Sequence, residues 1–385
     1  MTDQNGFTFH SPTRLFVGRG SVSEIPGLLA ERTEKKALVV TDKGLVNAGV
    51  AQQAIGVLEA AGIPFAVYDG VEENPPAHVV QACFDLYESA GCDWLLAIGG
   101  GSSMDTAKCA GVLAANGGRI EDHFGLLQDR KRVPFLLCAP TTYGTASEVT
   151  PFAVVTDNNH FKATVGGPHV IPDVGILDAN AAVALPMPIA AATGLDALTH
   201  AVESYVARAS NPIADGLALH AIRLISENLR QAAASHHNYA ATEQMLLASN
   251  MAGIAFSQTR LGNVHAMSHA VGGHYGVPHG VANAILLTRV MDFNKVACPE
   301  RFADIAVALG ENIDGLSHVE AADVSVEAVQ SLASDVGIPD TLAEVGVARE
   351  GIAVLAEDAM KSGNIRINPR HTTLKDIIAL YEAAM

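Results

Sequence analysis

The stretch Trp94–Lys108, WLLAIGGGSSMDTAK, joins a short apolar run to three consecutive glycines and then to a helix predicted over residues 106–115. An apolar run of this length that ends at glycine is typical of a buried strand. Consecutive glycines let the backbone approach a bound group, and the next helix offers free N–H groups and the positive end of its dipole. The stretch therefore predicts a phosphate-binding turn, with a tight turn that needs glycine for its own geometry as the alternative.

This turn matches neither of the two common nucleotide-binding motifs. Counted from Gly99, the sixth position of a G-x-G-x-x-G pattern is Met104, and no Gly-Lys-Ser/Thr follows as a Walker A loop requires. The prediction rests instead on the order strand, glycines, helix. The candidate cofactor-binding residues of the turn are Gly99, Gly100, Gly101, Ser102, Ser103 and Asp105.

The segments before this turn repeat the same strand-and-helix order. Strands are predicted at 36–41 and 63–68, each followed by a helical pattern, and this spacing is typical of a parallel α/β sheet. Ligands of such sheets bind beyond the carboxyl ends of the strands. Asp42 stands at one of these ends, where it could accept a hydrogen bond from an adenosine ribose hydroxyl and repel a 2′-phosphate, which would favour NAD over NADP. The alternative is an ordinary turn aspartate.

The sheet continues beyond residue 116. A strand predicted over 133–139 ends in the hydroxyl-rich loop PTTYGTASE at 140–148, which could bond a pyrophosphate and a ribose or could cap a helix. A hairpin is predicted from strands at 152–156 and 161–165. It contains Lys162, which could reach a cofactor or remain in solvent.

The apolar spacing becomes helical after Leu185 and stays so to the end of the chain. We therefore predict an α/β dinucleotide-binding domain over 1–185 and an all-helical domain over 186–385. No low-complexity linker separates the two.

The helical half contains a dense group of histidines in GNVHAMSHAVGGHYGVPHGVA, residues 262–282. His265 and His269 are four residues apart and share a helix face. Gly272-Gly273 is predicted to end this helix, and His279 opens the next one. Upstream, Asp196 and His200 show the same i, i+4 spacing, and Glu203 continues that face. Single residues of this kind can be satisfied core histidines or a helix-start acid.

Together, Asp196, His200, His265 and His279 offer one carboxylate and three imidazoles. This set suits Fe²⁺ or Zn²⁺ and contains too much nitrogen for Mg²⁺ or Ca²⁺. A catalytic ion would also need an open position for a substrate.

The composition excludes several other classes of protein. The chain has 385 residues, 49% of them hydrophobic and 17% charged, which indicates a compact globular protein. A net charge of −17 argues against nucleic acid or an anionic membrane as a partner. The five cysteines are scattered and contain no CxxC pair, as expected in a reducing compartment. We expect no signal peptide and no membrane span, and hence a cytoplasmic protein.

Four of these stretches occur in the order found in the iron-containing (group III) alcohol dehydrogenase family, and the chain resembles this family over nearly its whole length. They are GGGSSMDTAK at 99–108, PTTYGTASEVT at 140–150, ILDANAAVALPMPIAAATGLDALTHAVE at 176–203, and the histidine-rich stretch at 262–282. The resemblance implies the dehydroquinate synthase-like fold, with an NAD(P)-binding α/β domain, an all-helical domain and one divalent metal.

The resemblance also implies roles for single residues. It makes Asp196, His200, His265 and His279 metal ligands, and His269 a proton-transfer or positioning residue. It implies further cofactor contacts at Asn74, Thr141, Thr142, Thr145 and Lys162. It places Phe152, Phe256, Leu261 and Ser362 near the substrate, and Pro151 where a diol-oxidising relative has a polar side chain.

The implied activity is hydride transfer between a small primary alcohol, or its aldehyde, and the nicotinamide of NAD, with the metal as Lewis acid. A zinc-dependent glycerol dehydrogenase or dehydroquinate synthase of the same superfamily is the alternative. The second would need a strongly basic pocket, and no lysine or arginine cluster lies beside the metal motifs. A metallohydrolase is disfavoured because the chain has no HExxH motif. The resemblance further implies a homodimer or a larger homo-oligomer.

Overall fold

The computed structural model describes residues 6–30, 32–157, 162–235 and 237–385. It divides into two compact units, one made of residues 11–184 and the other of residues 185–385 together with the N-terminal segment up to His10. The start of the chain therefore differs from the predicted domain 1–185. Gln258 of the helical unit binds the N-terminal segment through two hydrogen bonds. Its Oε1 accepts from the His10 N–H at 3.1 Å, and its Nε2 donates to the His10 carbonyl at 2.9 Å.

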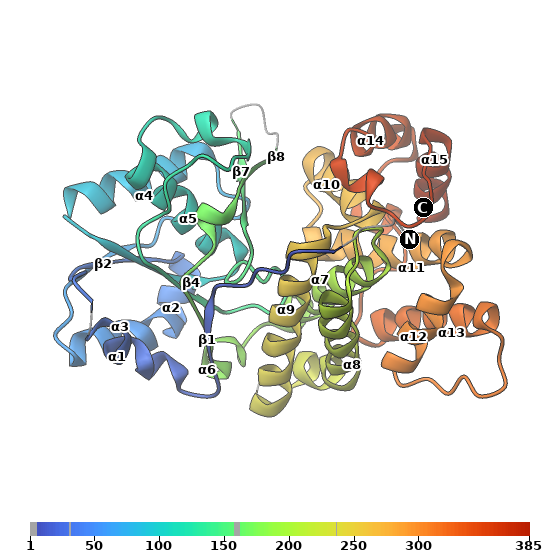
Figure 1. Cartoon of the computed structure of the whole chain (residues 1–385), viewed down its shortest axis with the longest axis horizontal. Helices are drawn as coiled ribbons and strands as arrows, with labels where there is room; N and C mark the ends of the chain where they lie inside the picture. The colour runs from blue at the N-terminus through green and yellow to red at the C-terminus, as the bar shows by residue number, and fades with distance from the viewer. Residues whose placement is uncertain (1–5, 31, 158–161, 236) are drawn as a thin grey trace. The chain divides into compact units, whose positions relative to one another are not determined.

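A six-stranded sheet in the order β1-β9-β6-β4-β2-β3 forms the centre of the first unit (Figure 1), and its strand pairs are parallel. β2 lies between β3 and β4, so the chain leaves β2 toward one side, returns, and continues on the other side. This is a topological switch point, where α/β sheets bind ligands. The strands are β1 (Arg14–Val17), β2 (Ala37–Val40), β3 (Phe65–Tyr68), β4 (Trp94–Gly99), β6 (Leu136–Pro140) and β9 (Val174–Leu177).

Helices cover both faces of this sheet (Figure 1). Alternate residues of β2 point to opposite sides: Ala37 and Val39 pack with one hydrophobic cluster, and Leu38 and Val40 with another. The first cluster includes residues of α1 and α3, and the second includes residues of α4 and α5. Continuous apolar runs are what a strand buried on both faces requires. The helices are α1 (Ile25–Leu29), α2 (Lys43–Asn47), α3 (Val50–Ala60), α4 (Ala77–Ser89), α5 (Gly101–Asn116) and α6 (Ala179–Ala182).

The helix after the glycines begins earlier than predicted, at Gly101 instead of Thr106. Glycine and serine have low helix propensity, so the sequence alone places them in the turn. In the structure β4 ends at Gly99, whose φ of 153° favours glycine, and a Cβ there would overlap Ser103. Ser102, Ser103 and Asp105 consequently lie inside α5.

A second sheet of three strands has the order β5-β8-β7. β7 (Phe152–Thr156) and β8 (Lys162–Gly166) are antiparallel, as the predicted hairpin requires, and β5 (Gly125–Leu126) is parallel to β8. The turn residues 158 and 159 and the first residue of the predicted second strand, 161, lie outside the described residues.

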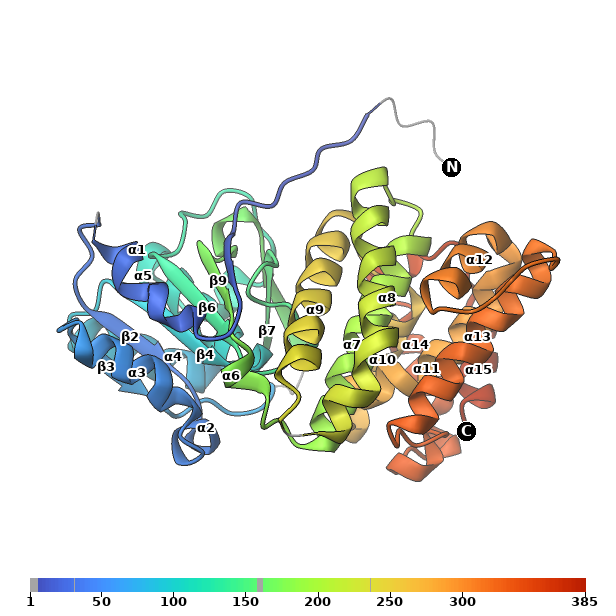
Figure 2. The ribbon, with the colours of Figure 1, turned by 90° about the horizontal axis from the view of Figure 1, so that it is seen from below.

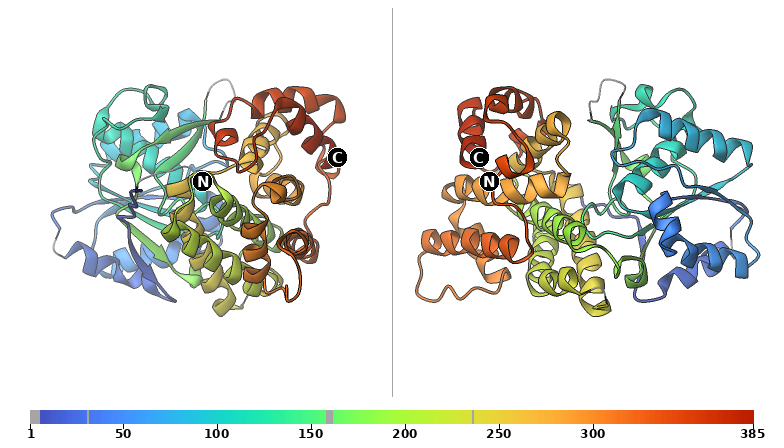
Figure 3. Two further views of the ribbon diagram at one scale, coloured as in Figure 1. Left: turned by 45° about the vertical axis from the view of Figure 1, so that its right-hand side comes forward. Right: turned by 180° about the vertical axis from the view of Figure 1, so that it is seen from behind.

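In the part that the structure describes, the secondary-structure elements of the second unit are all helices (Figure 3, green to red). α7, α8 and α9 pack side by side (Figure 2), and α11 packs against α7 and α10. Among the described residues, none of the helices is both long and apolar enough to cross a membrane. The helices are α7 (Met187–Val206), α8 (Pro212–Ala234), α9 (Tyr239–Thr259), α10 (Asn263–Tyr275), α11 (His279–Asn294), α12 (Pro299–Ala308), α13 (His318–Asp335), α14 (Ile352–Ala359) and α15 (Leu374–Ala383).

Candidate functional site

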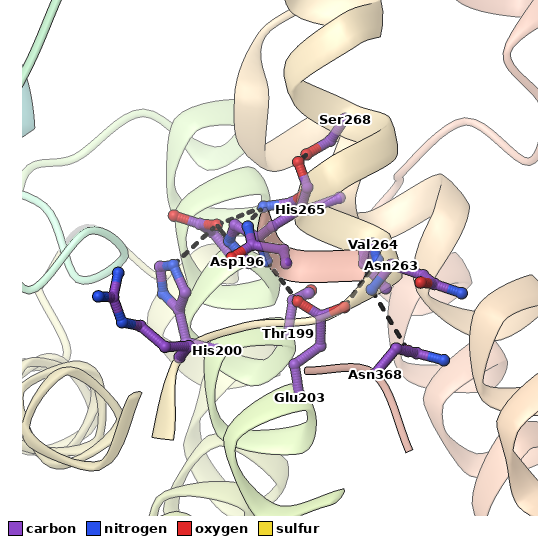
Figure 4. Close-up of polar contacts among 12 residues, drawn as sticks. Asp196, Thr199, His200, Glu203, Asn263, Val264, His265, Ser268 and Asn368 are labelled. Carbon is purple, nitrogen blue, oxygen red and sulfur yellow. Dashed lines mark hydrogen bonds and ion pairs between the residues drawn. The ribbon is translucent and has the colours of Figure 1, made fainter. Parts of the chain in front are cut away.

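Asp196 is the centre of a buried cluster of imidazoles in the helical unit (Figure 4). Its Oδ1 lies 3.8 Å from Nε2 of His200, 3.8 Å from Nε2 of His265 and 3.7 Å from Nε2 of His279. Ligand atoms of Asp196, His265 and His279 all lie within 4.8 Å of one another, which is close enough to share one metal ion. The structure thus brings together the four residues that the sequence singled out.

Three helices supply these side chains. Asp196 and His200 lie one turn apart on α7, His265 lies in the first turn of α10, and His279 is the first residue of α11. The next residue, Gly280, allows α11 to approach α7 closely, because a Cβ there would overlap the carbonyl of Ala192. The helix of His265 continues to Tyr275 and ends at Gly276 with a φ of 66°, so the predicted stop at Gly272-Gly273 is one turn early.

The chemistry of this cluster fits a divalent cation. Burial lowers the pKa of His265 well below its usual value, so the imidazole is neutral and its nitrogen is free to bind a metal. Burial raises the pKa of Asp196, and the attraction of His200 opposes this effect. A cation would compensate the buried charge, and a mixed carboxylate and imidazole set suits iron or zinc.

Asn283 supports this fit and was not predicted from the sequence. Its Nδ2 lies 2.7 Å from Asp196 Oδ1, 3.3 Å from His265 Nε2 and 3.1 Å from His279 Nε2. An N–H donor thus points at three atoms that a cation would bind, while the buried Oδ1 of the same amide has no hydrogen-bond partner among the described residues. The signal in the sequence was an amide four residues after His279 on an apolar helix.

Glu203 contacts both His265 and the start of α10, a role that its helix spacing alone did not reveal. Its Oε2 lies 2.7 Å from Nδ1 of His265, and its Oε1 accepts a hydrogen bond from the N–H of Val264 at 2.6 Å. Burial raises the pKa of Glu203 to about 7, and hydrogen bonds from the backbone N–H groups at the start of α10 oppose this effect.

Ring contacts surround the cluster. The His200 ring stacks between Phe256, at a centroid distance of 4.4 Å, and His265, at 4.6 Å. The His269 ring stacks on His279 at 5.1 Å. Of the residues expected near a substrate, Phe256 therefore contacts a proposed ligand directly. Leu261 follows α9 in the connection to α10, Ser362 caps a short 3₁₀ helix through Asn364, and Phe152 begins β7 in the other unit.

The predicted cofactor residues gather at the carboxyl ends of β2, β4 and β6. A Cβ on Gly100 would lie 3.4 Å from Thr142, and one on Gly101 would lie 2.8 Å from Thr145, so the hydroxyl-rich loop borders the glycine turn. Asp42 caps α2 by accepting from the Leu45 N–H at 3.0 Å. Thr141 bonds to the turn through its N–H, which donates to the Gly99 carbonyl at 3.0 Å.

Other predicted cofactor residues have clear contacts within the α/β unit. Asp105 accepts from Ser147 Oγ at 2.8 Å and from the Val154 N–H at 2.9 Å, so both carboxylate oxygens bond to the protein. Asn74 has a φ of 49°, and its carbonyl accepts from Thr156 Oγ1. Burial lowers the pKa of Lys162, and the charge of Glu73 opposes this.

A parallel sheet with a glycine-rich turn at its switch point, together with a buried carboxylate and imidazole cluster, is typical of a metal-dependent dehydrogenase. Residues 12–179 match the family model described as iron-containing alcohol dehydrogenase, and residues 190–385 match its C-terminal counterpart, Fe-containing alcohol dehydrogenase family, C-terminal. The chain belongs to the iron-containing alcohol dehydrogenase family, whose members are oxidoreductases that act on CH–OH groups.

Characterised proteins resemble the chain over its whole length. It is 42% identical over 370 residues to lactaldehyde reductase of Escherichia coli (strain K12), covering 95% of this chain and 96% of the relative. It is 40% identical over 378 residues to NAD-dependent methanol dehydrogenase of Bacillus methanolicus, covering 98% and 99%. A crystal structure of a 1,3-propanediol oxidoreductase superposes with a TM-score of 0.96 at 40% identity, covering 99% of this chain and 100% of the other.

Proposed function

We propose that the chain is an NAD-linked, iron-dependent alcohol dehydrogenase that interconverts small primary alcohols and their aldehydes. Asp196, His200, His265 and His279 would hold the iron. The observation that carries the proposal is the convergence of three imidazole Nε2 atoms on Oδ1 of the buried Asp196, at 3.7 to 3.8 Å. Zinc is the alternative metal, because it accepts the same ligands.

When bound, the metal would supply a Lewis acid for the substrate oxygen. The residues of the chain do the remaining work. Oxidation would remove a hydride from the carbinol carbon, which NAD would accept when bound, and a proton from the hydroxyl group. His269 stacks on the proposed ligand His279, and histidine is the usual proton carrier near neutral pH, so we assign this proton to His269.

The proposed substrate class follows from the relatives and from the wall of the cluster. The relatives are named for methanol, lactaldehyde and 1,3-propanediol, which are small molecules with an oxygen at a terminal carbon. The Phe256 ring covers one face of His200 and offers an apolar wall. Pro151 has no polar group for a second hydroxyl, so we expect no preference for diols over simple alcohols.

We also propose a cytoplasmic location and assembly into a homodimer or a larger homo-oligomer. All five cysteines are free thiols, and four of them are buried, as expected in a reducing compartment. The assembly state rests on the family resemblance alone.

The first experiment combines metal analysis of the purified protein with turnover assays on primary alcohols and diols, using NAD⁺ and NADP⁺. We expect about one iron or zinc per chain and NAD⁺-linked oxidation. Bound metal without any cofactor-linked turnover would favour the dehydroquinate synthase or the metallohydrolase alternative. No metal after anaerobic purification, with no activity after Fe²⁺ or Zn²⁺ is added, would contradict the proposed ligands.

Replacing Asp42 should change cofactor preference. Asp42→Ser removes the charge that repels a 2′-phosphate but keeps an oxygen that can cap α2 at the Leu45 N–H. We expect kcat/KM with NADP⁺ to rise about tenfold, a gain of roughly 1.4 kcal/mol. The control is Asp85→Ser, which removes the same charge from the exposed surface of α4. If the ratio of kcat/KM with NADP⁺ to kcat/KM with NAD⁺ is unchanged in Asp42→Ser, Asp42 does not face the ribose.

Gly100→Ala tests the phosphate-binding turn without disturbing the fold. Gly100 has an ordinary φ of −76°, and its new Cβ would meet Thr142 only at normal contact distances of 3.4 and 3.5 Å. The methyl group would occupy the space into which a phosphate must come, so we expect KM for NAD⁺ to rise about tenfold with an unchanged melting temperature. Gly56→Ala is the control, because no neighbouring atom in the described part of the chain lies within 4 Å of the added Cβ. Equal KM values in the two variants would contradict the assigned turn.

A further inference from the structure

The N-terminus of α10, the helix that carries His265, has no cap of its own. Its N-cap residue is Gly262, which has no side chain to accept a hydrogen bond from the first N–H groups. Two distant side chains accept these bonds instead (Figure 4). Oε1 of Glu203 on α7 accepts from the Val264 N–H at 2.6 Å, and Oδ1 of Asn368 accepts from the Asn263 N–H at 3.3 Å.

Glycine at position 262 lets the two acceptors come close to the backbone. A Cβ there would lie 3.0 Å from Oδ1 of Asn368 and 3.0 Å from Oε1 of Glu203. Asn368 is itself fixed by Asn294, since each amide nitrogen donates to the other residue's oxygen, at 2.9 and 2.7 Å. The start of α10 is therefore held in place by buried polar groups from outside the helix.

Glu203 has a second contact that links this anchor to the metal cluster. Its Oε2 lies 2.7 Å from Nδ1 of His265, so the carboxylate faces two neighbours, the Val264 N–H and the imidazole Nδ1. An ionised carboxylate can only accept, and a neutral imidazole has one N–H. The proton of His265 therefore belongs on Nδ1, and the lone pair belongs on Nε2, which faces Asp196 Oδ1 at 3.8 Å.

We propose that Glu203 is a positioning residue of the metal centre: it holds the Nδ1 proton of His265, so that Nε2 presents its lone pair to the metal, and it fixes the helix start that carries this ligand. This inference rests on the proposed function, because it takes His265 as a ligand. Hydrogen bonding of the second nitrogen is how proteins generally orient metal-binding histidines.

Glutamine is the informative replacement because it keeps the shape of glutamate and loses one acceptor. In Glu203→Gln a single oxygen remains for two donors. If it accepts from Val264, the amide NH₂ faces Nδ1, and the proton of His265 must move to Nε2, where it blocks the metal. If it accepts from His265 instead, the NH₂ faces the Val264 N–H. The first turn of α10 then loses one of its hydrogen-bond acceptors and is less stable. Both arrangements weaken the site.

The experiment measures the tautomer and the metal affinity separately. Long-range ¹H–¹⁵N NMR on metal-free protein with ¹⁵N-labelled histidine reports which nitrogen of His265 carries the proton, and a His265→Ala variant assigns the signal. Competition with a chelator gives the affinity for Zn²⁺ as the probe. We expect Nδ1–H in the wild-type protein and a 10- to 100-fold weaker affinity for Zn²⁺ in Glu203→Gln.

Asn368→Ala is the matched control, because it removes the other distant cap of α10 without touching His265. It should lower the melting temperature, leave the tautomer unchanged and weaken the affinity for Zn²⁺ much less than Glu203→Gln does. An Nε2–H tautomer in wild-type metal-free protein would overturn the inference, and this measurement needs no variant to fold. So would a Glu203→Gln protein with wild-type affinity. An Nδ1–H tautomer in a wild-type protein that binds neither Fe²⁺ nor Zn²⁺ would overturn the metal function, and the role of Glu203 with it.

Discussion

His279→Ala should lose its metal and its turnover together. His279 supplies one of the three ligand atoms that lie within 4.8 Å of one another, and no other donor of α11 is placed to replace it, since Asn283 offers its Nδ2 to the same atoms. Without the metal, the charge that develops on the substrate oxygen has no counterpart, so we expect kcat/KM to fall on the order of 10³-fold. Metal analysis should give far less than one ion per chain.

This loss should not come from unfolding. His279 is the first residue of its helix, and its side chain is 29% exposed, so removing it leaves no large cavity. His265→Ala would be a poorer test, since it would leave the buried carboxylate of Glu203 without its imidazole partner. We expect the far-UV circular dichroism and the melting temperature of His279→Ala to stay close to those of the metal-free wild-type protein.

His274→Ala is the matched control for this prediction. His274 lies in the same histidine-rich stretch, but its side chain is 39% exposed and its Nε2 bonds to Asp358 at 2.9 Å, away from the cluster around Asp196. A surface ion pair of this kind contributes less than about 1 kcal/mol. Metal content and turnover should therefore be unchanged. Full activity in a metal-free His279→Ala protein would contradict the metal site altogether.

The same cluster shows what the sequence could and could not reveal. The i, i+4 spacing of Asp196 and His200 and the density of histidines at 262–282 are local patterns, so the residues of the cluster could be named from the sequence. The contact from Glu203 to His265 spans 62 residues and that from Asn283 to Asp196 spans 87. Such contacts depend on how α7, α10 and α11 pack, which helical periodicity does not specify.

In the α/β unit, too, local patterns could be predicted from the sequence, whereas contacts between distant residues could not. Apolar runs closed by glycine or aspartate identified β2, β3 and β4 and their parallel order. The start of α5 was predicted five residues late, because glycine and serine propensities argue against a helix that the tertiary structure imposes. Asp105 was grouped with the cofactor residues because it lies near the glycines, whereas its oxygens bond to Ser147 and Val154, which are more than 40 residues away in the chain.

Lys108, three residues after Asp105 on α5, should be essential for the stability of the α/β unit. Its side chain is fully buried, and Nζ donates to the carbonyls of Thr150 and Phe152 at 2.9 and 2.7 Å. These carbonyls flank Pro151, and the segment leads from the loop of Thr141, Thr142 and Thr145 into β7. Burial lowers the pKa of Lys108, and the attraction of Asp105 opposes this. The ammonium group therefore holds the end of this loop against α5.

Lys108→Met keeps most of the side-chain volume and removes the charge. It removes the Nζ donor from both carbonyl oxygens and the positive charge of Lys108 from the buried carboxylate of Asp105. We expect a loss of about 3–5 kcal/mol in the free energy of unfolding. Urea unfolding followed by fluorescence measures this directly, because Trp94, the single tryptophan of the chain, is buried in β4 of the same unit.

The double variant Asp105→Asn/Lys108→Met separates charge from packing. If the lost unfolding free energy arises from the unpaired carboxylate, neutralising Asp105 should recover part of that loss. The coupling between the two sites would then be about 0.5–3 kcal/mol. If the cost arises only from the carbonyls of Thr150 and Phe152, the two losses should add. A loss below about 1 kcal/mol in Lys108→Met would mean that water or another donor satisfies both carbonyls, and that the loop is held by Asp105 through Ser147 and Val154 alone.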